Sequence, residues 1–222
     1  MTRDLIADET ETRQKPYSRS AVGRVQRKRM GRLFYAAITS LDGYVEDTVG
    51  KIDWGVPDEE VFRFTIDLER PIGTYLYGRR MYETMVYWET VPLDPSVSEF
   101  EREFTRMWQK AEKVVYSRSL KSASSARTRI EREFRPEAIR GLKSRTDHDL
   151  TVAGADLAGQ AIRAGLVDEI QQFVAPTILG GGKPWLPKSL RLNLELLDCK
   201  RFAGGFVFLR YAPKPGEIPP TD

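Results

Sequence analysis

At three positions in the sequence, an apolar segment that is expected to form a strand is followed directly by residues that could bind phosphate. These residues are a glycine, a serine or a run of small residues. Gly78 and Arg79 follow TYLY, Ser117 and Arg118 follow KVVY, and VAGADLAG holds a small-residue turn at residues 154–157. Glycine lets a ligand approach the backbone, and a guanidinium binds phosphate oxygens through two parallel hydrogen bonds. One such turn is ordinary in α/β proteins, but three in succession favour phosphate binding. The predicted phosphate-binding residues are Gly78, Arg79, Ser117, Arg118, Gly154, Ala155, Asp156 and Leu157.

The two arginines indicate which phosphate-containing ligand is expected. A bare pyrophosphate is commonly held by backbone N–H groups at a helix N-terminus, whereas an added arginine suits the 2′-phosphate of NADPH. The chain has no G-x-G-x-x-G fingerprint, so the standard Rossmann dinucleotide domain is not expected. The residues therefore predict NADPH on a different α/β fold.

The elements that must position these turns alternate between strands and helices. Residues 32–39 (RLFYAAIT) predict a buried strand, and Phe100, Phe104 and Trp108 lie four residues apart on one face of a helix expected over 95–110. Residues 166–179 predict a long strand, with Asp168 and Glu169 at its solvent-facing start. Residues 190–202 and 204–212 predict an antiparallel hairpin. We expect an α/β fold with a mainly parallel central sheet, helices on both faces and an antiparallel C-terminal edge.

Composition places this fold in a soluble class of protein. Of the 222 residues, 41% are hydrophobic and 30% are charged, and no apolar run approaches the length of a membrane span. Cys199 is the only cysteine, so no internal disulfide can form. No apolar stretch of the kind that a secretory signal needs is found at the N-terminus. We expect a cytoplasmic protein.

The positive charge is concentrated at the N-terminus. Residues 1–30 hold eight Lys and Arg against four Asp and Glu, which leaves the remainder nearly neutral. We expect a basic, disordered tail over residues 1–29 and one domain over 30–222, with Met30 a candidate start of translation. A nucleic-acid-binding domain would carry basic charge on the fold itself, so nucleic acid is not the expected partner. The alternative is a tail that tethers the domain to nucleic acid or to another anionic partner.

A set of motifs along the chain resembles the dihydrofolate reductase superfamily. SLDGYVED, LYGRRMYETMVYW, VVYSRSL, VAGADLAGQAI, GLVDEIQQFVAPTILGGGKPW and FVFLRY occur in the order found there. The strongest resemblance is to bacterial proteins built on the reductase domain of riboflavin biosynthesis. It runs from Gly31 to about Pro213 and implies a dihydrofolate-reductase-like three-layer fold.

The resemblance also implies an activity. It implies NADPH-dependent reduction of a small heterocycle, either pterin- or dihydrofolate-like or similar to 5-amino-6-(5-phosphoribosylamino)uracil. The ring is expected near Ala37, Ile38 and Asp42, with Ala37 and Ile38 also contacting cofactor and with Trp54 and Phe62 contacting substrate. Dimerisation of two identical chains is a further implication.

Glu59 is the implied source of the proton. In dihydrofolate reductases a Trp is followed by Pro three residues later and by a carboxylate five residues later, and Trp54, Pro57 and Glu59 repeat this spacing. Hydride transfer to a C=N bond needs a proton on nitrogen, which a half-buried Glu can hold near neutral pH. Acids also favour a helix N-terminus, so a purely structural role for Glu59 stays open. Asp42 is the second candidate catalytic residue.

At some positions this sequence differs from the residues that are typical of these reductases. GRRMYETMVYW replaces the segment with which riboflavin-pathway reductases hold a ribose phosphate, Val152 replaces an acid, and Met81 stands where dihydrofolate reductases have threonine. These departures keep open a second function: a nucleotide-binding protein of the same fold without reductase activity. His148 is the only histidine and is expected in a solvated loop, so a zinc-type metal site is not expected.

Overall fold

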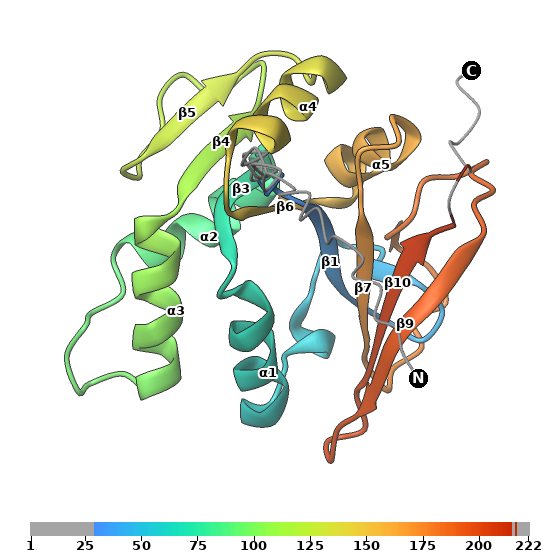
Figure 1. Ribbon diagram of the computed structural model, residues 1–222. Helices are drawn as coiled ribbons and strands as arrows, with labels where there is room; N and C mark the ends of the chain where they lie inside the picture. Colours follow the sequence, from blue (N-terminus) through green and yellow to red (C-terminus); the bar gives the residue numbers. More distant parts are fainter. Residues whose placement is uncertain (1–28, 215, 217–222) are drawn as a thin grey trace, which may run out of the picture.

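The computed structural model describes residues 29–214 and 216. An eight-stranded sheet crosses the molecule in the order β5-β4-β3-β6-β1-β7-β10-β9 (Figure 1). Its strands are β1 (Leu33–Thr39), β3 (Ile72–Gly78), β4 (Glu112–Tyr116), β5 (Thr128–Glu131), β6 (Asp149–Ala153), β7 (Glu169–Val174), β9 (Leu194–Arg201) and β10 (Val207–Pro213). β10 runs antiparallel to both of its neighbours, and the other neighbouring pairs are parallel. The predicted sheet and its antiparallel C-terminal edge are confirmed.

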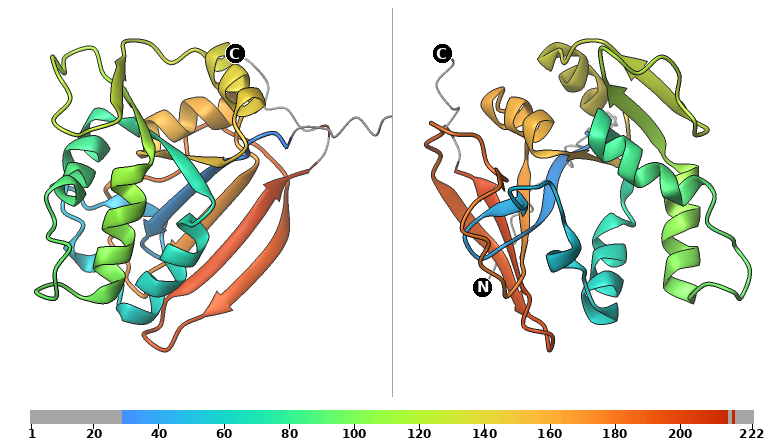
Figure 2. Two further views of the ribbon diagram at one scale, coloured as in Figure 1. Left: turned by 60° about the vertical axis from the view of Figure 1, so that its left-hand side comes forward. Right: turned by 180° about the vertical axis from the view of Figure 1, so that it is seen from behind.

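In the described part of the chain, five α-helices cover the sheet on both faces, as predicted (Figure 2). They are α1 (Glu59–Glu69), α2 (Arg79–Met85), α3 (Glu99–Lys110), α4 (Pro136–Arg145) and α5 (Ala155–Arg163). Successive residues of a strand point to opposite faces, so Leu76 packs in the core beneath α4 and α5 while Tyr75 and Tyr77 pack beneath α1 and α3. Two short 3-10 helices, Asp53–Gly55 and Val86–Glu89, precede α1 and follow α2.

Helix starts follow the local sequence signals. Asp58 caps α1 by accepting a hydrogen bond from the Val61 N–H, and Ser98 and Glu101 form a reciprocal capping box at the start of α3. Pro136 occupies the first position of α4, where its missing N–H costs nothing. The predicted helix over 95–110 therefore begins later than expected, because the cap is Ser98 rather than Pro95.

The C-terminal part departs from expectation in two ways. β7 ends at Val174, well short of Leu179, because the chain then turns away to pair β8 (Lys183–Pro184) with β2 (Tyr44–Glu46) in a separate two-stranded sheet. The expectation that Asp168 and Glu169 face solvent is wrong for Glu169, which is buried, whereas the Asp168 side chain is 35% exposed. The Glu169 residue is 3% exposed and pairs with Arg32, and the Asp168 carboxylate accepts hydrogen bonds from the Leu33 N–H and from Lys143.

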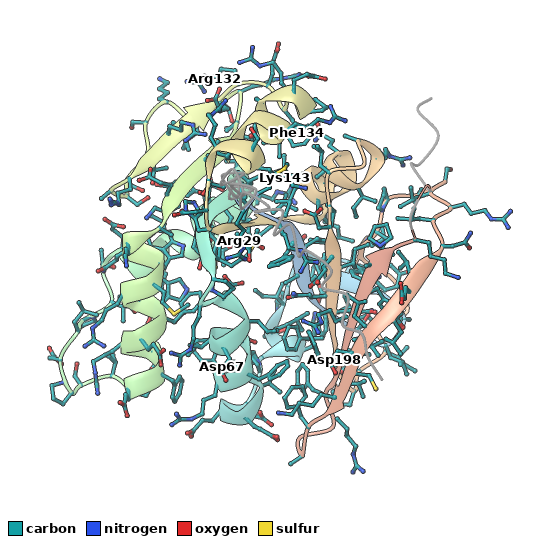
Figure 3. All side chains as sticks on the ribbon, viewed as in Figure 1. Arg29, Asp67, Arg132, Phe134, Lys143 and Asp198 are labelled. Atoms are coloured by element: carbon teal, nitrogen blue, oxygen red, sulfur yellow. The ribbon has the colours of Figure 1, made fainter. Side chains whose placement is uncertain are left out.

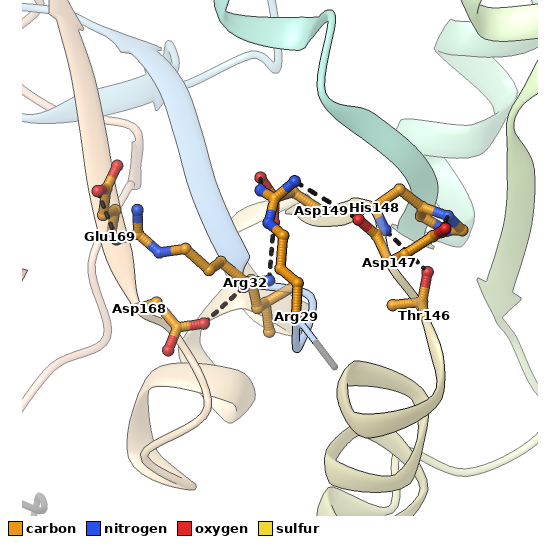
Figure 4. Close-up of polar contacts among 9 residues, drawn as sticks. Arg29, Arg32, Thr146, Asp147, His148, Asp149, Asp168 and Glu169 are labelled. Carbon is orange, nitrogen blue, oxygen red and sulfur yellow. Dashed lines mark hydrogen bonds and ion pairs between the residues drawn. The ribbon is translucent and has the colours of Figure 1, made fainter. Parts of the chain in front are cut away.

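These acids belong to a network at the amino ends of β1, β6 and β7 (Figure 4). The Asp149 carboxylate, also buried, accepts hydrogen bonds from the Arg32 N–H at 2.9 Å and from the Arg29 guanidinium at 2.6 Å. The network holds the entering chain against the sheet edge opposite the predicted phosphate-binding turns. The tail expected over residues 1–29 lies outside the described residues, except for Arg29.

Candidate cofactor and substrate site

The three predicted phosphate-binding turns lie side by side. β3 has β4 on one flank and β6 on the other, with Gly78 opposite Tyr116 and Tyr77 opposite Ala153. The exits of these strands therefore place Ser117, Gly78 and Gly154 along one stretch of the carboxyl edge. A side-chain carbon added at Gly154 would lie 3.8 Å from the Gly78 nitrogen. The sequence motifs thus converge on one place, where open α/β sheets bind ligands.

The two predicted arginines are exposed on this edge. Arg118 is exposed, and within the described part of the chain no carboxylate pairs with it. Arg79 is half exposed, and its Nε lies 3.8 Å from a Glu83 carboxylate oxygen, which is a long ion pair. Both guanidinium groups are therefore available to an anion from solution.

Ser117 plays a structural role as well as the predicted one. Its buried hydroxyl oxygen accepts a hydrogen bond from the Leu120 N–H at 3.0 Å, and its carbonyl accepts one from Arg132 at 2.8 Å. Arg132 lies beyond β5, near Phe134 (Figure 3). Its contacts with the Ser117 and Leu120 carbonyls shape the 117–120 loop that presents Arg118, and no motif in the sequence points to this role.

The turn at residues 154–157 offers mainly backbone groups to a ligand. Gly154 has a φ of 97°, and it is followed directly by α5, whose first turn has no side-chain cap. The Leu157 side chain is buried in the core beneath α5, so only its backbone can face a ligand. The Asp156 side chain is 84% exposed and pairs with Lys183 Nζ at 2.6 Å. Ala155 and Gly154 are half-buried.

Ala37 and Ile38 lie near the carboxyl end of β1, where both are half-buried. Ala37 packs against the core beneath α5, and Ile38 packs against the core that contains Phe173 and Phe208. A side-chain carbon added at Gly55 would lie 3.1 Å from Ile38, so the turn at Trp54 closes tightly over this strand.

Asp42, in the loop after β1, is hydrogen-bonded to the loop that follows β7. Its carboxylate accepts hydrogen bonds from the Leu179 N–H at 3.1 Å and from the Gly180 N–H at 2.7 Å. Hydrogen bonding from the Ser40 hydroxyl, and then from these N–H groups, lowers the pKa of Asp42. The geometry therefore gives Asp42 the role of an ionised acceptor that holds the glycine-rich loop. Its catalytic role stays a prediction.

Glu59 occupies the first turn of α1 in an exposed position. Its side chain is 63% exposed, and one carboxylate oxygen accepts a hydrogen bond from Arg63 Nε at 2.8 Å and forms an ion pair with Arg63 Nη2 at 2.8 Å. The half-buried setting from which the proton-supply argument started is not present. The acid-rich start of α1 fits the structural interpretation, and proton supply by Glu59 stays a prediction.

Trp54 and Phe62 do not share a cluster. Trp54 is half-buried against the core of Phe173, Phe202 and Phe208, and its indole N–H donates to the Lys51 carbonyl at 3.1 Å. Phe62 packs in the other direction, against Trp88, Phe100 and Phe104 of the core beneath α3. Contact of either side chain with a substrate stays a prediction.

Sequence reasoning missed one hollow at this edge. A pocket of about 550 Å³ is lined by residues 46–50, Arg80, Gly182 and Lys183. Its walls come from β2, α2 and β8, and β2 and β8 are separated by well over a hundred residues in the chain. The signal available in the sequence was Gly182, where φ is 138° and an added side-chain carbon would lie 2.0 Å from the Glu46 carbonyl oxygen.

The described residues hold few other sites. Among residues 29–214, no three His, Cys, Asp or Glu side chains gather closely enough to hold a metal ion. No helix in this part of the chain has the length and apolar character to cross a membrane. His148 is not fully solvated, since its Nε2 lies 2.9 Å from the Thr74 hydroxyl and its ring packs on Gly73.

The sequence that forms this fold matches the model of a known protein family. The RibD C-terminal domain family matches residues 32–208, which is most of the chain. The chain belongs to the RibD C-terminal domain family. The predicted resemblance to riboflavin-pathway reductase domains is thereby confirmed.

Relatives of this RibD C-terminal domain share both sequence and fold. The uncharacterized protein YyaP of Bacillus subtilis (strain 168) is 29% identical over 182 residues, 81% of this chain and 94% of YyaP. A pyrimidine reductase-like protein from Corynebacterium diphtheriae superposes with a TM-score of 0.62 and 16% identity, covering 82% of this chain and 92% of that one. Dihydrofolate reductase from Enterococcus faecalis, in complex with NADP(H), superposes with a TM-score of 0.53 and 13% identity over 83% and 98% of the two chains. The dihydrofolate-reductase-like fold is confirmed.

Proposed function

We propose that this chain is an NADPH-dependent reductase of a small pyrimidine- or pterin-like heterocycle. The observation that carries the proposal is the meeting of Gly78, Ser117 and Gly154 on one sheet edge, with the exposed Arg79 and Arg118 beside them. The family supports reductase chemistry, and the names of the two structural relatives, a pyrimidine reductase-like protein and a dihydrofolate reductase with NADP(H), support the ligand classes.

In this proposal the main role of the protein is to bind the cofactor and the substrate and to orient their reacting rings. The 154–157 turn offers backbone N–H groups to the pyrophosphate, and Arg79 and Arg118 bind the 2′-phosphate. When bound, NADPH supplies the hydride. Ala37 and Ile38 form the apolar floor beneath the reacting rings, and Asp42 holds the 179–180 loop over them. Placing the two rings in contact is the main source of rate acceleration.

Proton supply is the least supported part of the proposal. Glu59 is the nearest match to the family's carboxylate, but Arg63 holds one of its oxygens and solvent surrounds the side chain. A carboxylate in this setting stays a good hydrogen-bond acceptor for ring N–H groups. In this proposal Glu59 orients the ring and relays a proton that comes from water.

A binding protein without turnover is the second candidate. It is favoured by the same exposure of Glu59 and by Met81, which replaces a threonine and lies against Gly154. Such a protein keeps the phosphate-binding edge and lacks a protected proton donor.

One assay separates the two candidates. NADPH oxidation is followed at 340 nm with dihydrofolate, other pterins and the riboflavin-pathway aminopyrimidine, and NADPH affinity is measured on the same preparation. Turnover of any one compound supports the reductase and names its ring. NADPH binding without turnover favours the binding protein, and no NADPH binding contradicts both.

A further inference from the structure

The loop between β4 and β5, residues 117–127, is attached to α2. Its Leu120 and Ala123 side chains pack against the core that contains Tyr82 of α2. The Tyr82 residue is 2% exposed, and its hydroxyl oxygen accepts a hydrogen bond from the Ser124 N–H at 2.9 Å. The helix therefore contacts both the middle of the loop and its far end.

The Tyr82 hydroxyl belongs to a chain of hydrogen bonds that runs in one direction. The hydroxyl oxygens of Tyr82 and Ser125 are 2.9 Å apart, and those of Ser125 and Thr128 are 2.7 Å apart. Thr128 donates its proton to the Ala126 carbonyl at 2.9 Å, so it accepts from Ser125. The Tyr82 proton then goes to Ser125, because Ser124 Oγ is farther away at 3.4 Å. A connected chain of this kind holds its members in one arrangement.

The 3-10 helix that follows α2 holds the same end of the loop. Its Glu89 accepts a hydrogen bond from the Ala126 N–H at 2.9 Å through Oε1. The near end of the loop is held from elsewhere, by Arg132 beyond β5 and by the Ser117 hydroxyl. The far end thus depends on α2 and the segment after it.

The same helix carries one of the two arginines of the proposed cofactor site. Arg79 is the first residue of α2, and Tyr82 follows three residues later. Gly78 lies opposite Tyr116 in the sheet, so Arg79 and Arg118 stand at neighbouring strand exits. These two guanidinium groups belong to a helix and to a loop, and contacts between helix and loop set the spacing between them. The Tyr82 hydroxyl makes such contacts.

We propose that Tyr82 is a positioning residue for the 2′-phosphate of NADPH. Its hydroxyl holds the 117–127 loop against α2 and so keeps Arg118 within reach of the phosphate that Arg79 binds. The proposal rests on the proposed function, because it takes NADPH to be the ligand of the two arginines. Tyr82 acts through Arg118 and does not touch the ligand. A loop that is already ordered binds more tightly, since no ordering cost is subtracted from the affinity.

The first test uses Tyr82→Phe, which removes the hydroxyl and keeps the ring in the core. NADPH and NADH affinities of the full chain and of the variant are measured by titration calorimetry. NADH lacks the 2′-phosphate. The variant is expected to bind NADPH about fivefold more weakly and NADH within about twofold of the unaltered chain.

Tyr77→Phe is the matched control for a merely structural effect. Tyr77 is also a buried tyrosine, but its hydroxyl accepts a hydrogen bond from the Trp108 N–H inside the core. This variant is expected to lower Tm and to leave the ratio of NADPH to NADH affinity unchanged. If Tyr82→Phe also lowers Tm without changing that ratio, its hydroxyl is only structural and the proposal is wrong.

A double variant tests whether Tyr82 acts through Arg118. Two residues that act through one contact have non-additive effects. In a chain that carries Arg118→Ala, Tyr82→Phe is expected to weaken NADPH binding no further. A second fivefold loss in that chain would contradict the proposal.

Hydrogen exchange provides a measurement without any ligand. Tyr82→Phe removes the acceptor of the Ser124 N–H, so exchange at this amide is expected to become faster, whereas Tyr77→Phe is expected to leave it unchanged. An unchanged rate at Ser124 in Tyr82→Phe would mean that the hydroxyl does not hold the loop.

Failure of the positioning role is distinguishable from failure of the proposed function. If the unaltered chain binds NADPH and Tyr82→Phe keeps its ratio of NADPH to NADH affinity, the positioning role is wrong while the proposed function stands. If the unaltered chain binds neither dinucleotide, both fail, whatever the exchange rate at Ser124.

Discussion

Arg118 stands at the exit of β4, exposed and without a carboxylate partner among residues 29–214. Its proposed ligand is the 2′-phosphate, which NADH lacks. Arg118→Ala is therefore expected to weaken NADPH binding about tenfold and to leave NADH binding within about twofold. Fluorescence titration with both cofactors measures the ratio. Equal losses for the two cofactors would place Arg118 on another part of the ligand.

The contacts of Glu59 fit both a structural role and a role in proton supply. If it orients the ring and relays a proton, Glu59→Gln is expected to lower kcat about tenfold or more at pH 7 while NADPH affinity is unchanged. Steady-state assays with the compound that turns over measure this effect. Glu60→Gln is the control, because Glu60 lies beside it on α1 but accepts a hydrogen bond from the Ala203 N–H in the β9–β10 turn. Full turnover by Glu59→Gln ends the proton-supply role.

Two glycines at the ends of adjacent strands differ in whether their backbone conformation tolerates a side chain. Gly154 has a φ of 97°, whereas Gly78 has a φ of −70° and open space where a side-chain carbon would stand. Gly154→Ala is expected to cost about 1–2 kcal/mol of unfolding free energy and to weaken NADPH binding. Gly78→Ala is expected to weaken NADPH binding at nearly unchanged stability. Urea unfolding and cofactor titration of both variants separate the effects, and a stable Gly154→Ala would contradict the strain argument.

The packing of α1 on β3 buries a carboxyl group. The Oε2 atom of Glu69 is fully buried, and burial raises the pKa of Glu69 to about 7, an effect that the neighbouring Tyr75 hydroxyl partly offsets. Between pH 4.5 and about 7 the folded chain keeps a proton that the unfolded chain has released. This group therefore makes the free energy of unfolding fall as pH rises through that window.

Glu69→Gln removes this dependence. At pH 8 the variant is expected to exceed the unaltered chain in stability by on the order of 2 kcal/mol, and at pH 4.5 the two are expected to be similar. Urea unfolding at both pH values measures the difference. Asp67→Asn is the control, since Asp67 is an exposed acid of the same helix (Figure 3). A Glu69→Gln difference that is the same at both pH values would argue against a raised pKa.

At the scale of the whole molecule, a network of ion pairs and the proposed ligand site lie at opposite edges of one sheet. The network of Arg29, Arg32, Asp149, Asp168 and Glu169 lies at the amino ends of β1, β6 and β7, and the proposed cofactor turns lie at the carboxyl ends. Asp149→Ala leaves the Arg32 N–H and a guanidinium without their buried partner. It is expected to cost about 3 kcal/mol of unfolding free energy.

The same variant is expected to bind NADPH with unchanged affinity below its unfolding transition, because Asp149 and the proposed cofactor turns lie at opposite ends of the strands. Thermal unfolding and titration at 20 °C provide the two measurements. A parallel loss of affinity would mean that the amino edge supports the site through the strands.

Local signals in the sequence determined much of this protein. Runs of apolar residues predicted β1, β3 and β4, the four-residue spacing of Phe100, Phe104 and Trp108 predicted α3, and glycines with arginines marked the exits that the sheet later brought together. These features are readable because hydrophobic periodicity and turn chemistry depend on neighbours in the chain.

Only the tertiary structure decided what depends on distant partners. The pairing of β2 with β8, and with it the Arg80–Lys183 pocket, joins segments on either side of five strands. The burial of Glu169 and the exposure of Glu59 also reversed expectations that treated each acid by its local sequence. The free energy of a charged side chain is set by the partners and the solvent around it, and long-range packing supplies both.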